Sequence, residues 1–279
     1  MERICYDFCG ISTEILSPLP IPDPSEPFLK DTDASKLKIT LTTCNNLPQP
    51  EGMLLGKTGD AEIWRQGSEI TRLSRDRFRP MAHMSVSYDL ENWSCVHALV
   101  RREYWAWAAG SRYLWTGLGL PQLLLHAGVL LFHASYIGFR GQGILFVAPS
   151  GTGKSTQAEL WRRCRGAEII NGDKAAVRLG IACMSCSVPF SGTSGICRNL
   201  SLPLKAVVVL SQAPENTVRR LAPAEAAGAL GSNMFTERIV SEEWSMALNC
   251  LLSLVSSVPV YALSCTPDER AVSALEHVL

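Results

Sequence analysis

The chain has 279 residues, of which 47% are hydrophobic and 19% are charged, so it can bury a sizeable core, and this composition argues against general disorder. Its 26 basic and 26 acidic side chains give a formal net charge of zero, which argues against a long nucleic-acid footprint and against a polybasic membrane surface. The length corresponds to one large domain or two modest ones.

Two stretches bear on the location of the protein, the N-terminus and the longest apolar segment. The first residues include early acidic side chains and no apolar segment of the kind found in signal peptides. Residues 117–139 are apolar, but Pro121, His126 and His133 interrupt them, which makes a poor membrane span. We therefore expect a cytoplasmic protein whose ten cysteines stay reduced, mostly as small buried side chains.

The N-terminal third of the chain is predicted to be rich in β-strands. Alternating apolar positions predict strands at residues 3–8, 11–16, 37–42, 61–65 and 84–88. Proline-rich and glycine-containing segments between them, at residues 17–24 and 46–52, predict loops.

The pattern changes near Trp93. Spacings of three, four and five residues predict one long helix that ends near Gly117, and the residues that recur are Val96, Leu99, Tyr104, Trp107 and Tyr113. Pro121 then begins a shorter apolar helix. We place the boundary in this region, between a β-rich N-terminal domain at residues 1–125 and a second domain at residues 126–279.

From about Val129 the pattern becomes strand, turn, strand, helix, strand, which is typical of an α/β nucleotide-binding domain. Later strands are predicted at residues 207–210 and 258–263, and later helices begin at Pro223 and at residue 268.

Residues 143–156 are the most informative stretch. An apolar strand runs into Ala-Pro-Ser-Gly-Thr-Gly-Lys-Ser-Thr, and a helix is predicted to follow. The spacing is that of a P-loop (Walker A) motif, except that Ala148 replaces the first glycine. Glycines let backbone N–H groups turn toward a phosphate, and the start of the helix adds a positive dipole end. The predicted nucleotide-binding residues are Ser150, Gly151, Thr152, Gly153, Lys154, Ser155 and Thr156.

Within this motif Lys154 is expected to reach the β- and γ-phosphates, and the Ser155 hydroxyl is expected to bind Mg²⁺. Two alternatives stay open. One is a glycine turn that arose by chance between a strand and a helix, and the second is a degenerate loop that binds nucleotide without turnover.

The residues before the loop resemble a known family. His133, the Gly-Gln-Gly sequence at residues 141–143 and the loop occur at the separations found in the C-terminal catalytic domain of HPr kinase/phosphorylase. The wider superfamily includes the ATP-dependent phosphoenolpyruvate carboxykinases, and the resemblance is closer to HPr-kinase-like proteins found beside peptide-modification genes. It covers roughly residues 130–279. The N-terminal region does not resemble the regulatory domain of true HPr kinases.

The resemblance implies roles for two further residues. The family has an acidic pair after the next strand, where this chain keeps Asp173 but has Gly172. Asp173 would help to hold Mg²⁺ and accept the proton of an attacking hydroxyl. His133 would polarise the γ-phosphate or orient Asp173. The alternatives are that Asp173 only caps a turn and that His133 is a satisfied core side chain.

Residues 189–199 form a third candidate element, a polar loop with two glycines and three small hydroxyl residues. Arg198 is the best candidate cation for transition-state charge, because a guanidinium matches phosphate oxygens in a forked geometry. Lys174 is the alternative cation, and a surface turn with a solvated Arg198 is the alternative structure.

Cys183 and Cys186 have the spacing of half a zinc site, but no second ligand pair is suitably spaced, so two thiols in a strand turn are expected.

These observations predict an α/β protein: a P-loop nucleotide-binding domain of HPr-kinase type behind a smaller β-rich α+β domain. We expect a kinase that uses ATP or GTP with Mg²⁺ and transfers the γ-phosphate to a hydroxyl of a small molecule or a peptide serine. Asp173, His133, Lys154 and Arg198 are the predicted catalytic residues, and Ser155 and Asp173 the metal ligands.

We expect no nucleic-acid or membrane partner, and assembly as a homo-oligomer stays open. The rival functions are a phosphorylase- or carboxykinase-like reaction and a non-catalytic nucleotide sensor.

Overall fold

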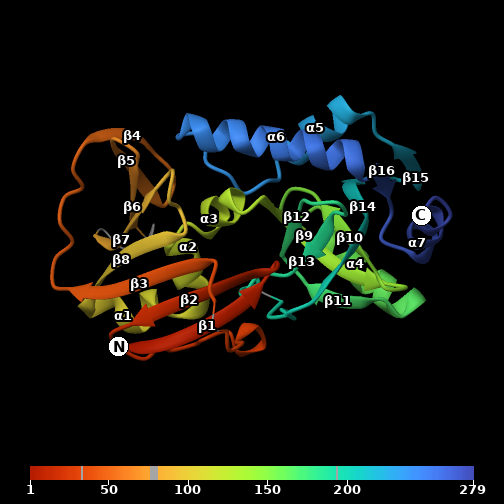
Figure 1. Ribbon diagram of the computed structural model, residues 1–279. Coiled ribbons are helices and arrows are strands. Elements are labelled where there is room, and N and C mark those ends of the chain that lie inside the picture. The colour runs from red at the N-terminus through yellow and green to blue at the C-terminus, as the bar shows by residue number, and fades with distance from the viewer. Residues whose placement is uncertain (33, 76–80, 193) are drawn as a thin grey trace. The chain divides into compact units, whose positions relative to one another are not determined.

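The computed structural model describes residues 1–32, 34–75, 81–192 and 194–279. The chain forms two compact units, each with a large β-sheet and helices (Figure 1). The first consists of Met1–Ala127 with Glu237–Trp244, and the second of Gly128–Thr236 with Ser245–Leu279. The fold is therefore mixed α/β, with two large sheets.

The first unit is built on a sheet with the strand order β1-β2-β3-β8-β7-β6-β5-β4. Its neighbours are antiparallel except for β2–β3 and β3–β8, which are parallel. Buried side chains alternate with more exposed ones along β2 and β3, as expected for strands with one face on a core. The strands are β1 (Glu2–Phe8), β2 (Ile11–Ser17), β3 (Leu37–Cys44), β4 (Met53–Lys57), β5 (Ala61–Gln66), β6 (Glu69–Arg75), β7 (Ala82–Asp89) and β8 (Cys95–Arg101).

The prediction of one long helix ending near Gly117 is wrong. Its first part is strand β8, in which Val96, Ala98 and Val100 are buried with the period of two that a strand requires. The rest is divided into short helices because Gly110 has extended backbone angles. The helical elements of this unit are η1 (Glu26–Phe28), η2 (Arg102–Tyr104), α1 (Trp105–Ala108), α2 (Ser111–Gly117) and α3 (Leu120–His126).

A buried polar network joins the 237–244 segment to the rest of the first unit. Glu243 accepts a hydrogen bond from the Tyr88 hydroxyl at 2.6 Å and lies 3.0 Å from His126 Nε2. Arg72 forms a buried ion pair with Glu237. The ring of His126 is therefore paired within the first unit, which supports a structural role for this residue.

The second unit has a sheet with the order β10-β9-β12-β13-β14-β16-β15, and β11 pairs with β9. Strands β10, β14 and β16 run parallel, so their carboxyl ends lie at one edge, where Val147 pairs with Val209 and Gln212 with Cys265. The strands are β9 (Val129–Phe139), β10 (Gln142–Val147), β11 (Glu168–Asn171), β12 (Lys174–Arg178), β13 (Met184–Cys186), β14 (Ser201–Gln212), β15 (Thr217–Arg220) and β16 (Val260–Cys265).

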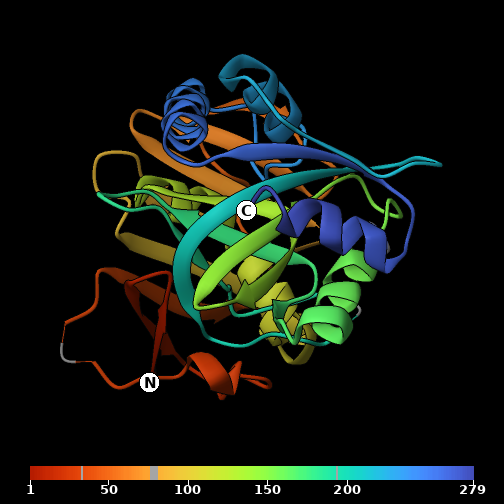
Figure 2. The same cartoon turned by 90° about the vertical axis from the view of Figure 1, so that its right-hand side faces the viewer.

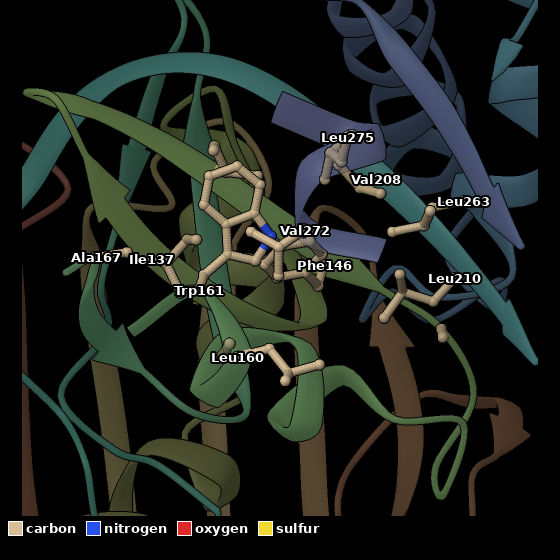
Figure 3. Close-up of a cluster of buried hydrophobic side chains, with 13 residues drawn as sticks. Ile137, Phe146, Leu160, Trp161, Ala167, Val208, Leu210, Leu263, Val272 and Leu275 are labelled. Atoms are coloured by element: carbon tan, nitrogen blue, oxygen red, sulfur yellow. The ribbon is translucent and has the colours of Figure 1, made fainter. Parts of the chain in front are cut away.

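Helices α4 and α7 lie next to one another against this sheet (Figure 2). Trp161 of α4 is fully buried between the two helices and the strands (Figure 3). Its ring centroid lies 5.1 Å from that of Phe139. Val272 and Leu275 of α7 complete this core, and burying each stabilises the fold by about 1.5–3 kcal/mol. The core thus fixes the start of α4 at the carboxyl end of β10. The helices are α4 (Lys154–Arg165), α5 (Pro223–Gly231), α6 (Ser241–Ser257) and α7 (Glu269–Glu276).

Within the described parts of the chain, no helix is both long enough and apolar enough to cross a membrane. All ten cysteines lie in these parts and carry free thiols.

Candidate functional site

The loop between β10 and α4, residues 148–153, turns sharply, so that α4 begins close to the end of β10. Gly151 and Gly153 have φ values of +81° and +115°, which only glycine adopts without strain. Ala148 is fully buried and is not among the positive-φ residues, so its methyl group is accommodated where the motif has its first glycine. The first backbone N–H groups of an α-helix have no partner within the helix, and those of α4 begin at this loop.

The predicted nucleotide-binding residues are divided between this loop and the first turn of α4. The loop contributes four of them, and the helix begins at Lys154. Ser155 and Thr156 are both exposed at the helix start. The four loop residues are Ser150, Gly151, Thr152 and Gly153.

Lys154 points back into the loop and is 6% exposed. Its Nζ donates hydrogen bonds to the carbonyl oxygens of Ala148 at 2.8 Å and Pro149 at 3.1 Å. Burial lowers the pKa of Lys154, and the negative charge of Asp173 partly offsets this. The two side chains are therefore near enough to interact, although they come from different elements.

His133 and Asp173 meet beside this lysine. Asp173 directly precedes β12, whose Lys174 is the register partner of His133 on β9. His133 Nδ1 lies 3.4 Å from Asp173 Oδ1, and the imidazole packs edge-on against Phe235 with ring centroids 6.0 Å apart. Burial lowers the pKa of His133, the charges of Lys154 and Lys174 lower it further, and Asp173 acts in the opposite direction.

Lys174 is a buried cation next to the carboxylate. It forms an ion pair with Asp173, and its ammonium lies 5.3 Å from the ring of Phe190 and 5.4 Å from that of Phe235. Burial alone would raise the pKa of Asp173, but the hydrogen bond and charge of Lys174, with the charges of His133 and Lys154, outweigh it and lower that pKa. Asp173 is thus held ionised at neutral pH.

Asn171 holds the turn that presents Asp173, and it was not among the residues predicted from the sequence. Its Oδ1 accepts hydrogen bonds from the backbone N–H groups of Asp173 at 3.1 Å and Lys174 at 3.0 Å. Its Nδ2 donates to the Phe190 carbonyl oxygen at 3.2 Å, which ties the 189–199 loop to the same turn. The Asn-Gly dipeptide was an available signal, because this pair is a strong turn former.

Ser194 of the 189–199 loop packs against Gly172. A Cβ atom at Gly172 would lie 2.3 Å from Ser194 Oγ and 2.9 Å from Ser194 Cβ. Real Cβ atoms essentially never come this close, so a side chain at position 172 would require Ser194 to shift. Asp173 is the single carboxylate of the turn between β11 and β12.

The structure does not bring Arg198 to this cluster. Arg198 forms an ion pair with Glu168, and the two side chains are 61% and 45% exposed. Glu168 pairs with Gly138, whereas the residue that precedes the glycine loop, Val147, pairs with Ala134. Gly138 and Ala134 are four residues apart on β9, which corresponds to about 13 Å. The position of Arg198 therefore gives no support to its expected role. Lys174 is the cation that lies beside Asp173.

Other parts of the 189–199 loop do approach the site. A Cβ at Gly192 would lie 2.6 Å from Asp173 Cγ, so the loop backbone passes directly against the carboxylate. Thr193 of the same predicted loop lies outside the described residues.

A pocket that was not predicted from the sequence adjoins the helix start. Its volume is about 560 Å³, and it lies at the carboxyl ends of β14 and β16. Its lining combines the glycine loop and α4 with the segments after those strands, including Gly153, Thr156, Gln157, Gln212, Cys265 and Thr266.

Cys183 and Cys186 are buried free thiols at the start and end of a short strand segment. Within the described ranges, no group of three or more His, Cys, Asp or Glu side chains is placed to hold a metal ion.

Two of three comparisons with known proteins give matches. The family model described as SynChlorMet cassette protein ScmC matches residues 121–279, more than half of the chain. Among solved structures, the HPr(Ser) kinase/phosphatase from Coxiella burnetii is similar, with 11% sequence identity and a TM-score of 0.31, over 53% of this chain and 95% of that one. No curated protein matches the sequence.

Proposed function

The chain belongs to the family of SynChlorMet cassette protein ScmC, and we propose that it is a phosphotransferase that moves the γ-phosphate of a nucleoside triphosphate to a hydroxyl group. One observation carries the proposal. Lys154 at the start of α4, His133 on β9 and Asp173 before β12 are far apart in the sequence but interact electrostatically at one place. That place is where a strand–glycine-loop–helix connection offers backbone N–H groups to an anion.

The phosphate chain would lie along residues 150–156. An ammonium group has three N–H donors. Two of those on Lys154 are directed at the carbonyl oxygens of Ala148 and Pro149, and the third can donate to a phosphate oxygen. The positive end of the α4 dipole supplements this charge.

The residues present suit Mg²⁺. The exposed Ser155 hydroxyl and the ionised Asp173 carboxylate are hard oxygen ligands of the kind that Mg²⁺ prefers. The cation would neutralise charge on the phosphates, and the remaining ligands would come from phosphate oxygens and water.

Asp173 would also receive the proton of the acceptor. As the acceptor oxygen bonds to the γ-phosphorus and the bond to the leaving diphosphate breaks, the hydroxyl proton passes to the carboxylate. His133, 3.4 Å away and with a lowered pKa, would hold the carboxylate in place as a neutral ring. Lys174 would offset negative charge as it develops. The acceptor would be a small molecule or a peptide serine.

Two rival functions make different demands on this site. Phosphorolysis needs a group that returns a proton to the leaving hydroxyl, and Asp173 would have to serve alone, because Gly172 stands where the family has the other acidic residue. A nucleotide sensor needs binding without transfer, and it would be insensitive to replacement of Asp173.

The test is transfer from γ-labelled ATP with Mg²⁺ to a metabolite extract and to a pool of serine-containing peptides. We expect a labelled product with the wild type and none with Lys154→Ala. Lys205→Ala removes a lysine from β14 of the same unit and should preserve the product. Equal labelling by folded Lys154→Ala would overturn the proposal, and nucleotide binding without any product would favour the sensor.

A further inference from the structure

The pocket beside α4 has the size and position of a nucleoside site. Its volume of about 560 Å³ falls within the range of small-molecule pockets, roughly 300–1,000 Å³. It lies at the carboxyl ends of the parallel strands β14 and β16, beside the loop that follows the parallel strand β10. Gly151, Gly153 and Thr156 line one side, so a molecule in the pocket would continue from phosphates held by the glycine loop.

One buried polar atom in this pocket has no hydrogen-bond partner among the residues that the structure describes. Gln157 on α4 is 2% exposed and lines the pocket. Its Nε2 donates to Cys265 Sγ at 3.2 Å, while its Oε1 is unpaired within the described chain. Buried amide oxygens are almost always paired, so a ligand that donates a hydrogen bond to Oε1 would complete the pairing of this side chain.

Other lining residues suit a flat aromatic ring. Leu210, Ala213 and Pro267 give the pocket apolar surface. Gln212 connects it to the glycine loop, because its Nε2 donates to the carbonyl oxygens of Gly151 at 3.5 Å and Thr152 at 3.4 Å. The pocket therefore combines apolar walls with a small number of polar groups, which is the usual composition of a specific small-molecule site.

We propose that this pocket binds the nucleotide base and that Gln157 selects adenine over guanine. The proposal rests on the nucleotide-dependent function proposed above and adds the identity of the base. Adenine carries an amino group at position 6 that donates hydrogen bonds, whereas guanine carries a carbonyl oxygen there. The amino group of adenine would donate a hydrogen bond to Gln157 Oε1. The guanine oxygen is itself an acceptor, so it would repel Oε1 instead.

The experiment measures the dissociation constants of ATP, GTP and purine riboside triphosphate with Mg²⁺ by calorimetry on the full chain. Purine riboside triphosphate lacks only the 6-amino group of ATP. We expect the wild type to bind ATP about tenfold more tightly than either of the others, the effect of one hydrogen bond to a buried group. In Gln157→Leu the three constants should agree within about twofold.

Gln142→Leu is the matched control, because it makes the same substitution at the far end of β10 from the glycine loop. It should keep the tenfold preference. If Gln157→Leu does not fold, the wild-type comparison of ATP with purine riboside triphosphate still decides the question.

Inorganic tripolyphosphate, which has no base, separates the two proposals. If it competes with all three nucleotides and they bind the wild type equally, the assignment of Gln157 is overturned and the phosphate site stands. A preference for GTP overturns the assignment as well. If neither tripolyphosphate nor any nucleotide binds, the proposed function and the base assignment are both wrong.

Discussion

His133 lies on β9 and Asp173 directly precedes the neighbouring antiparallel strand β12, and His133 Nδ1 lies 3.4 Å from Asp173 Oδ1. The register fixes the pair, because the N–H of Ala134 donates to the Asp173 carbonyl oxygen at 3.0 Å. The two pKa values are lowered together: burial and two lysines disfavour the imidazolium, and the same lysines favour the carboxylate despite burial. The result is a neutral imidazole beside an ionised carboxylate at neutral pH.

The lowered pKa of His133 predicts a pH dependence of stability. A group whose folded pKa lies below its unfolded value binds protons more readily in the unfolded chain, so it stabilises the fold above about pH 6.5 and loses that contribution as the pH falls below it. We expect the ring to titrate with a midpoint below 6.5 in NMR spectra.

The chain has five histidines, so the contribution of this one needs a difference measurement. The free energy of unfolding should fall less between pH 7 and pH 5 in His133→Asn than in the wild type. A midpoint above 6.5, or the same fall in both proteins, would contradict the electrostatic description of the site.

Replacing Asp173 by Asn separates binding from chemistry. The amide keeps the shape but accepts a proton poorly, so transfer should slow by about 10²-fold or more while nucleotide binding stays largely intact. Steady-state kinetics and calorimetry measure the two effects, and a thermal melt checks the fold, since Lys174 loses its ionic partner. Transfer within twofold of the wild type would remove Asp173 from the mechanism.

The strand–loop–helix connection could be predicted from sequence because its signals are local. Glycines, a lysine and a hydroxyl residue follow an apolar strand within one short stretch, and the structure has β10, a positive-φ glycine turn and α4 there. The strand pairing that brings His133 to Asp173 is a long-range contact, and only the family resemblance suggested it.

The missed features depend on three-dimensional context. Strand β8 alternates at Val96, Ala98 and Val100, but aromatic residues farther along suggested a helical spacing instead. The pocket at Gln157 is assembled from segments after two distant strands, so no local pattern marks it. Arg198 was chosen for its chemistry alone, and its ion pair with Glu168 depends on how the 189–199 loop runs along β11.

The packing of Ser194 against Gly172 predicts a mutational coupling. A methyl group at Gly172 would overlap Ser194, so Gly172→Ala should lower the free energy of unfolding by about 1–3 kcal/mol. Ser194→Gly should change it by less than about 0.5 kcal/mol, because residue 194 is exposed. In the double variant most of the loss should be recovered.

Urea denaturation of the four proteins measures this coupling as a double-mutant cycle. Additive losses would mean that Ser194 does not occupy the space beside Gly172.

Arg198 and Lys174 offer the clearest contrast between chemical expectation and position. Arg198 is 61% exposed and paired with Glu168, so Arg198→Gln should leave stability within about 0.5 kcal/mol and ATP-dependent transfer within twofold. Lys174 is buried beside Asp173, and Lys174→Gln removes a charge-assisted contact worth about 1.5–3 kcal/mol of stability. We also expect transfer to slow by about tenfold or more, because a buried cation no longer offsets the charge that develops in the transition state. Both variants remove one positive charge. Measuring kcat and KM for ATP in both therefore compares the loss of a cation beside Asp173 with the loss of a cation paired with Glu168. A large loss in Arg198→Gln with little change in Lys174→Gln would show that the 189–199 loop rearranges to bring Arg198 to the phosphates.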